Sequence, residues 1–286
     1  MNSGYSSKTL HREIASSITM YEDQERFNIA YLILEDLFGI TKTDLMLDKK
    51  VAEIYPDKIK DIINRLNKAE PIQYILGHTE FYGRKFKVSR HVLIPRPETE
   101  ELVDLIVQEN RKIKNSSVLD IGTGSGCIAV SLKKEIPGAS VFALDISKEA
   151  LAVAGQNARE LGAEAVLIES DIRNYDKNTF QGMSFNIIVS NPPYVTDSEK
   201  TLMHPNVLNY EPETALFVRD EDPLLFYRTI AEFGNKYLKP GGTCYFEINE
   251  RYGEQIKALF EKNKYINIRI IRDLHGKDRF AAASKI

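Results

Sequence analysis

The sequence has few cysteines, no long apolar run and no excess of basic residues, and each absence narrows what the protein can be. Its 286 residues include two cysteines, Cys127 and Cys244, which lie in apolar surroundings at no spacing that suits a metal. We therefore predict two buried thiols and no metal site. No secretory signal stands near Met1, and no apolar run approaches membrane-spanning length, so we expect a soluble, cytoplasmic protein with no membrane partner.

The charge balance argues against a protein that grips a long nucleic-acid backbone. The formal net charge is −3, and the first 76 residues carry 10 Lys and Arg against 12 Asp and Glu. Binding to a phosphate backbone relies on clustered basic side chains. We therefore expect no direct nucleic-acid partner, and we expect a monomer.

The first 76 residues have a helical pattern and carry no cluster that suggests chemistry. Apolar residues recur at three- and four-residue spacings up to Phe38, where Gly39 follows as a C-cap, and again over residues 57–68 after Pro56. We predict a small helical substrate-recognition domain over residues 1–76. Residues 80–88 then predict two short strands around a turn at Gly83, so residues 77–94 form a β-hairpin linker.

From residue 117 onward, predicted strands alternate with predicted helices. The strands are expected at residues 118–121, 141–144, 165–169, 185–190 and 243–248. One helix is expected before the alternation, at residues 101–108, and the helices within it are expected at residues 128–135, 148–161 and 224–237. This alternation predicts an α/β fold with a doubly wound, mainly parallel sheet, and we assign residues 95–286 to one catalytic domain.

A glycine loop follows the first of these strands and predicts half of a binding site. Its residues are Gly122, Thr123, Gly124, Ser125 and Gly126. Glycines allow a sharp turn and the close approach of a ligand, and the helix that follows offers free N–H groups. An acidic residue, Asp145, ends the next strand and is suited to accept both hydroxyls of a ribose. The G-x-G-x-G spacing differs from the dinucleotide fingerprint G-x-G-x-x-G and favours S-adenosylmethionine, which has no pyrophosphate.

Two residues after the third strand are candidates for contact with the adenine. The Asp171 carboxylate could accept from the adenine amino group, and Ile172 could pack on the ring. Asp171 is equally suited to cap a helix or turn. The sequence leaves this choice open.

The tetrapeptide Asn191-Pro192-Pro193-Tyr194 ends the strand predicted at residues 185–190 and supplies the other half of the site. Neither proline can continue the ladder, so a stiff loop is expected at the carboxyl edge of the sheet, where such folds bind ligands. We expect the Asn191 side-chain oxygen and the Pro192 carbonyl to accept the two hydrogens of a planar amino group, with Tyr194 packed on its plane. No side chain in the loop is suited to act as a general base.

With both loops in one sheet, the chain resembles the class I S-adenosylmethionine-dependent methyltransferases of Rossmann-like fold, and more narrowly the HemK/PrmC family. Matching segments extend beyond the tetrapeptide, to residues 77–83 (GHTEFYG), 94–100 (IPRPETE), 210–217 (YEPETALF) and 273–279 (DLHGKDR). One departure is visible: where the family usually carries a glycine after Glu247, this chain has Ile248-Asn249, and Asn249 could take a left-handed conformation there.

The resemblance implies methylation of a glutamine side-chain nitrogen (N5) in the Gly-Gly-Gln loop of class 1 peptide chain release factors, and hence a role in translation termination. S-adenosylmethionine would be the methyl donor and S-adenosylhomocysteine the product. The glycine loop, Asp145, Asp171 or Ile172, and Asn191 would line the cofactor. The tetrapeptide would hold the acceptor, and the resemblance places Phe81, Arg84 and the segment from Arg96 to Glu98 at the border of its pocket. For Phe81 a position in the core of the hairpin is favoured over this role.

Three other functions fit parts of the pattern. A ribosomal-protein glutamine methyltransferase shares the chemistry and differs in its helical domain. A DNA adenine methyltransferase uses the same kind of loop, but it must extrude the base and hold the backbone with cationic residues. The charge balance and the flanking segments argue against it. A non-catalytic scaffold is disfavoured by the intact acceptor loop.

Overall fold

The computed structural model describes residues 4–113 and 115–286. They form two compact units. One contains the chain up to Gly77 together with His204–Tyr210, and the other contains His78–Met203 and Glu211–Ile286. Among the helices described, none is both long and apolar enough to cross a membrane.

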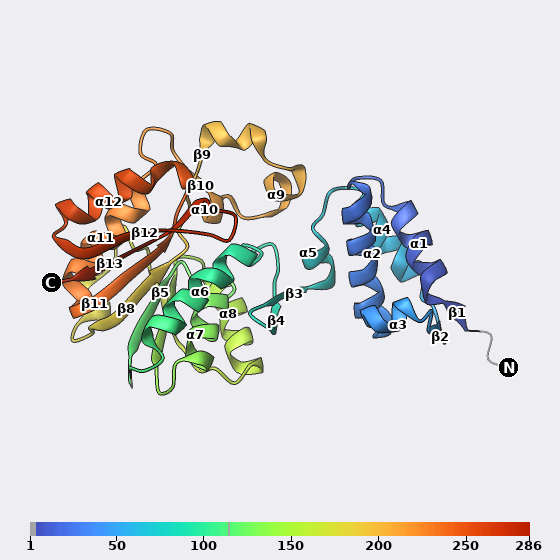
Figure 1. The fold of residues 1–286 in the computed structure, drawn as a ribbon, viewed down its shortest axis with the longest axis horizontal. Helices are drawn as coiled ribbons and strands as arrows, with labels where there is room; N and C mark the ends of the chain where they lie inside the picture. Colours follow the sequence, from blue (N-terminus) through green and yellow to red (C-terminus); the bar gives the residue numbers. More distant parts are fainter. Residues whose placement is uncertain (1–3, 114) are drawn as a thin grey trace. The chain divides into compact units, whose positions relative to one another are not determined.

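The first unit is a small helical bundle, blue to cyan in Figure 1 apart from α9. Its elements are β1 (Tyr5–Ser6), α1 (Ser7–Ser17), α2 (Asp23–Phe38), α3 (Lys42–Met46), β2 (Lys50–Val51), α4 (Pro56–Leu66), α5 (Ile72–Leu76) and α9 (Pro205–Tyr210). Apolar faces of α1, α2 and α4 share one core. As expected, α2 ends at Gly39, which adopts a left-handed conformation (φ 62°). The Tyr210 hydroxyl donates to the Lys68 carbonyl at 2.9 Å, which fixes α9 to this bundle.

The second unit begins with the predicted hairpin. β3 (His78–Phe81) pairs with β4 (Arg84–Lys87) in antiparallel register, with Phe81 opposite Arg84. Tyr82 and Gly83 form the two-residue turn, and both have positive φ (50° and 67°). Positive φ at both turn positions matches the right-handed twist of a hairpin, which explains why Gly83 marks the turn.

A seven-stranded sheet forms the centre of the second unit. Its order is β12-β13-β11-β8-β5-β6-β7. The five strands from β11 to β7 are parallel, and β13 runs antiparallel to both of its neighbours. The strands are β5 (Ser117–Ile121), β6 (Ser140–Asp145), β7 (Val166–Glu169), β8 (Phe185–Ser190), β11 (Leu238–Glu247), β12 (Tyr265–Arg272) and β13 (Asp278–Lys285). The mainly parallel, doubly wound sheet predicted from the sequence is confirmed.

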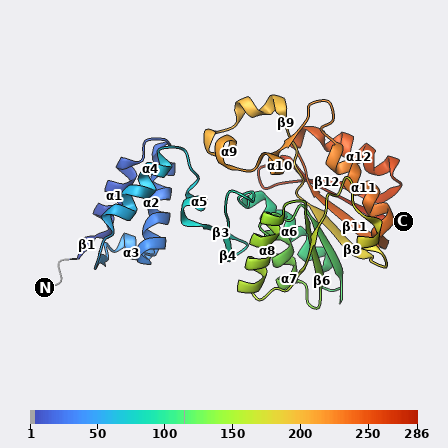
Figure 2. The same cartoon turned by 180° about the vertical axis from the view of Figure 1, so that it is seen from behind.

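Helices cover both faces of this sheet (Figures 1 and 2). One face packs against α6 (Pro97–Asn110), α7 (Cys127–Glu135) and α8 (Lys148–Glu160), and the other against α11 (Leu225–Tyr237) and α12 (Gly253–Lys262). Successive residues of a strand point to opposite faces, so Val118 joins the first core and Leu119 the second. Both cysteines are buried and unpaired, as predicted.

Short elements complete the loops around the sheet. They are η1 (Lys177–Phe180), β9 (Val195–Thr196), η2 (Asp197–Leu202), α10 (Glu213–Leu216), β10 (Phe217–Val218) and η3 (Glu250–Tyr252). The strands β12 and β13 were not predicted. β13 contains three consecutive alanines, Ala281 to Ala283, which are weak strand formers, and they adopt a strand because β11 and β12 pair with them on both sides.

Candidate functional site

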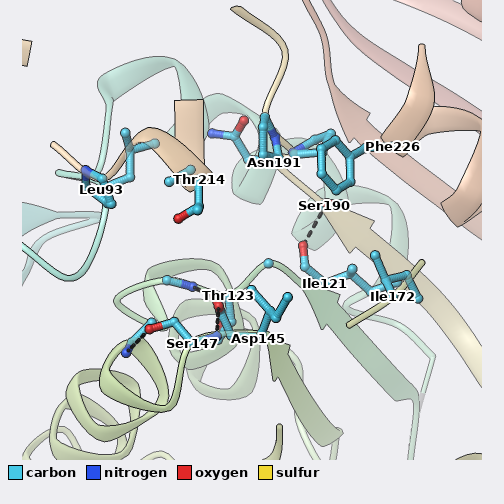
Figure 3. Close-up of a pocket in the computed structure, with 18 of the residues that line it drawn as sticks. Leu93, Ile121, Thr123, Asp145, Ser147, Ile172, Ser190, Asn191, Thr214 and Phe226 are labelled. Carbon is cyan, nitrogen blue, oxygen red and sulfur yellow. Dashed lines mark hydrogen bonds between the residues drawn. The ribbon is translucent and has the colours of Figure 1, made fainter. Parts of the chain in front are cut away.

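A cavity of about 1110 Å³ lies at the carboxyl edge of the sheet in the second unit. It opens where β5 and β8 end side by side, with Ile121 opposite Ser190. The Ser190 hydroxyl donates to the Ile121 carbonyl at 2.7 Å, which joins the two strand ends. The chain crosses from one side of the sheet to the other between these strands, and such switch points open a crevice for ligands. Figure 3 shows Asn191 and Asp145 on opposite sides of this cavity.

The glycine loop lines one wall of the cavity, and its backbone needs the glycines. Gly122, Gly124 and Gly126 all have positive φ, at 73°, 55° and 79°. A Cβ on Gly126 would lie 3.1 Å from the Cβ of Ala154, so this glycine also permits α7 and α8 to pack closely. Thr123 and Ser125 complete the loop and also line the cavity.

Asp120 supports this loop from below. Its side chain is fully buried, and Oδ2 accepts from the Thr123 hydroxyl at 2.6 Å and the Ala129 amide at 3.2 Å. The other oxygen, Oδ1, has no hydrogen-bond partner among the described residues. Burial raises the pKa of Asp120 to about 7, although the two donors oppose the shift.

Asp145 lies at the end of β6 and faces the cavity, as its position in the sequence predicts. Its two oxygens accept from the backbone amides of Gly124 and Ser147, both at 2.9 Å. Burial raises the pKa of this carboxyl, and the backbone donors lower it. Each carboxylate oxygen has a further lone pair, so the held carboxylate can still accept hydroxyls from a ligand.

Asp171 and Ile172 both line the cavity but differ in what they offer. The Asp171 carboxylate accepts from the Arg173 backbone amide and forms a bidentate ion pair with its guanidinium. Arg173 holds the pKa of Asp171 below its usual range. The turn-capping role is therefore present in the structure. Ile172 and Phe226 form an apolar end of the cavity that suits a flat ring (Figure 3).

Asn191, Pro192 and Pro193 line the opposite wall, and the Asn191 side chain is held from behind. Its Nδ2 donates to Oγ1 of Thr99 at 3.3 Å. Thr99 lies in the first turn of α6 and donates in turn to Oε2 of Glu247 at 2.6 Å. A chain of hydrogen bonds thus connects the acceptor loop to the last residue of β11.

Tyr194 does not line the cavity, which corrects the expectation that its ring packs on the acceptor amide. The ring packs against the core between the sheet and α11, and the hydroxyl donates to Oε1 of Glu247 at 3.0 Å. Burial and the neighbouring Glu247 carboxylate raise the pKa of the Tyr194 phenol, so it stays a neutral donor. The physical reason is that this hydroxyl has a buried carboxylate to satisfy.

Glu247 is the centre of this group and is 1% exposed. Burial raises the pKa of its carboxyl, while the hydroxyls of Thr99 and Tyr194 and the positive charge of Arg279 lower it. Arg279 is held by an ion pair with Asp273 at 3.1 Å. Asp273 also accepts two backbone amides of its own turn. The C-terminal motif that the sequence singled out therefore places a cation near Glu247.

Arg96 lines the cavity, as predicted. Its guanidinium forms a 2.6 Å ion pair with Glu211, whose other oxygen accepts the Ile94 amide at 3.2 Å. The Glu211 side chain is 1% exposed and the Arg96 side chain 32%. This pair fixes the entry to α6, and with it the backbone that carries Thr99.

Two predicted border residues do not reach the cavity. Phe81 is 1% exposed and packs edge-on against Phe86 in the core, because the hairpin buries that face against the sheet domain. Arg84 does not line the cavity and pairs with Glu135 on α7. The border position that the resemblance implied for these two residues is therefore not found, and Phe81 is the hairpin core residue that the sequence favoured.

The turn after β11 also differs from expectation. Asn249 has φ −68° and is not left-handed. Its side-chain oxygen accepts the Arg251 amide at 3.1 Å, so it caps η3, and its amide donates to the Tyr194 carbonyl at 3.3 Å. Asn249 therefore supports the acceptor loop from the turn after β11.

Sequence reasoning missed Thr99, Glu247 and Glu211 as members of the site. Each belongs to a segment that the sequence marked, but nothing in its spacing indicates a buried carboxylate or a hydroxyl between two partners. It also missed other residues that line the cavity from separate segments of the chain, among them Leu93, Ser147, Thr214 and Phe226. In the part of the chain that is described, no group of three or more metal-ligating side chains gathers.

Solved structures share the fold of this chain. A methyltransferase from Pyrococcus furiosus is 19% identical and superposes with a TM-score of 0.52 over 71% of this chain and 89% of its own. The hMettl16 catalytic domain superposes with a TM-score of 0.57 at 15% identity, over 74% and 81% of the two chains. The fold is therefore that of the class I methyltransferases.

Sequence comparison narrows the class. Residues 99–209 match the methyltransferase small domain, and residues 11–77 match the PrmC N-terminal domain. A release factor glutamine methyltransferase of Bacteroides thetaiotaomicron is 50% identical over 93% of this chain and 95% of its own, and one of Flavobacterium psychrophilum is 47% identical over 91% and 92%. The chain belongs to the release factor glutamine methyltransferase family.

Proposed function

We propose that this protein transfers a methyl group from S-adenosylmethionine to the side-chain amide nitrogen of the glutamine in the Gly-Gly-Gln loop of class 1 release factors. The observation that carries the proposal is the pairing of Ile121 with Ser190, because it puts the glycine loop and Asn191 on one cavity. The names of the similar proteins support release factors as the substrate.

The residues of the cavity fit the cofactor. Asp145 is a held carboxylate with free lone pairs for ribose hydroxyls, and Ile172 and Phe226 offer an apolar end for the adenine. The positive-φ glycines leave the loop without side chains where a ligand would approach. When bound, S-adenosylmethionine supplies a methyl group on a sulfonium centre.

The Asn191 loop would orient the acceptor. A glutamine amide nitrogen is a poor nucleophile because its lone pair is delocalised into the carbonyl. The Asn191 side-chain oxygen and the Pro192 carbonyl would accept its two hydrogens, which fixes its orientation and opposes the positive charge that develops on nitrogen. No general base is needed before transfer. Tyr194 would hold the Asn191 loop in position from behind, through its hydrogen bond to Glu247.

The helical unit would recognise the release factor. The two glycines before the glutamine, in the release factor's Gly-Gly-Gln loop, would allow that loop to enter the cavity. Neither contribution involves the chemistry at Asn191. The helical unit should therefore determine which protein is methylated. The sheet unit should determine that the methylated group is an amide.

The test is incubation of the purified protein with labelled S-adenosylmethionine and, in parallel, a release factor, a ribosomal protein and duplex DNA. We expect label on the release factor, at glutamine. Label on the ribosomal protein alone would show that the substrate is a ribosomal protein and not a release factor. Label on DNA alone would overturn the proposal. Asn191→Ala should reduce turnover at least about 100-fold, the loss typical of removing one preorganised partner, with a smaller change in cofactor affinity.

A further inference from the structure

The carboxamide of Asn191 has two ends with opposite hydrogen-bonding properties. Its oxygen only accepts and its nitrogen only donates, and rotation by 180° exchanges them. In the proposed function, the oxygen must face the acceptor glutamine, because both hydrogens to be accepted are on the substrate. If the Asn191 carboxamide were inverted, its N–H group would face the N–H group of the acceptor glutamine, and no hydrogen bond could form. Something in the protein must therefore select one orientation.

The Thr99 hydroxyl can make this selection because it has only one proton. That proton is donated to Glu247 across a short 2.6 Å contact. The oxygen of Thr99 can then only accept from Asn191, and only the nitrogen end of the carboxamide can donate to it, at 3.3 Å. The oxygen end is left for the cavity.

Glu247 keeps the direction of this chain fixed. One of its oxygens accepts from Thr99 and the other from the Tyr194 hydroxyl at 3.0 Å. Both hydroxyls donate to it, so both point their protons toward the Glu247 oxygens. The carboxylate is 1% exposed, which excludes competing water, and Arg279 supplies nearby positive charge.

We propose that Thr99 is a positioning residue for methyl transfer, and that the buried Glu247 carboxylate, acting through its hydroxyl, holds Asn191 with the amide oxygen toward the acceptor. This inference rests on the proposed function. Thr99 suits the role because it lies on the rigid first turn of α6, with its amide donating to the Arg96 carbonyl at 3.1 Å, and because its branched side chain has few rotamers.

The test compares Thr99→Val, which keeps the shape but loses the hydroxyl, with Thr99→Ser, which keeps the hydroxyl. Methylation of a purified class 1 release factor gives kcat and KM, and calorimetry with S-adenosylhomocysteine gives cofactor affinity. We expect T99V to lower kcat about 10- to 100-fold, the loss typical of a misaligned reacting group, with cofactor affinity within about twofold. T99S should restore kcat to within about threefold of the unmodified protein.

Two results would overturn the inference. One is a folded T99V with unchanged kcat. The other is a T99S that loses as much as T99V, since the methyl group and not the hydroxyl would then matter. If T99V does not fold, Glu247→Gln decides, because a glutamine amide places a donor against one of the two hydroxyls and should lower kcat at least about tenfold. An inactive Asn191→Ala beside an unaffected T99V and E247Q would refute this inference and leave the proposed function standing.

Discussion

The buried carboxylate of Asp120 should make the stability of the sheet unit depend on pH. The side chain is fully buried below the glycine loop, and burial raises its pKa from 3.8 to about 7. Below pH 3.8 the group is protonated in both the folded and the unfolded chain. Above about pH 7 it is ionised in both, and the folded chain then holds a charge that only two donors, Thr123 and Ala129, stabilise.

The sign follows from proton binding. Between these two pH values the folded chain binds more protons than the unfolded chain, so the free energy of unfolding falls as pH rises. A pKa raised from 3.8 to about 7 corresponds to about 4 kcal/mol, fully lost above pH 7. The stabilising contribution is present at low pH, which is opposite to the usual behaviour of a paired aspartate.

Asp120→Asn removes this dependence. Asparagine can accept from the same two donors through its oxygen but does not ionise. Urea unfolding followed by circular dichroism at pH 5, 6, 7 and 8 should show the variant gaining stability relative to the unmodified protein as pH rises. Glu261→Gln, at an exposed position on α12, is a control for the loss of one negative charge. A stability difference that stays constant across this range would refute the reasoning.

Two further substitutions test the cofactor wall. Gly126→Ala should destabilise the protein by about 2 kcal/mol or more, because φ is 79° and the new Cβ would lie 3.1 Å from Ala154. Gly124→Ala is the matched control, because its φ is also positive but, among the described residues other than its chain neighbours, none would lie within 4 Å of the new Cβ. Equal losses of stability in urea unfolding would show that the contact with Ala154 is unimportant. Asp145→Ala should weaken S-adenosylmethionine binding about tenfold, the value of one net hydrogen bond. Unchanged affinity in calorimetry would remove Asp145 from the ribose role.

Features of the fold that depend on residues close together in the sequence could be predicted from the sequence. Gly83 marks the hairpin and Gly39 ends α2, because both adopt positive φ, which glycine tolerates. The alternation of apolar runs and helical periods predicted the parallel part of the sheet. It did not predict β13, where weak strand formers are held by pairing on both sides.

The residues of the site also divide into those whose position could be predicted from the sequence and those whose position could not. Asp145 could be predicted to face the cavity because it is the last residue of a strand that ends at the carboxyl edge of the sheet. Phe81 and Arg84 were assigned to the acceptor border by resemblance, and their side chains pack elsewhere. For these two residues the segment could be recognised from the sequence, but the direction of the side chain could not.

The sequence by itself determined the two loops, their order along the chain and the chemical groups they carry, because backbone preferences and hydrogen-bonding capacity are properties of short segments. Only the tertiary structure decided how those groups are held. Thr99 and Glu247 are 148 residues apart, and Tyr194 precedes Glu247 by 53. They meet because α6, β8 and β11 pack together, and a buried carboxylate acquires its partners only when the whole sheet has formed.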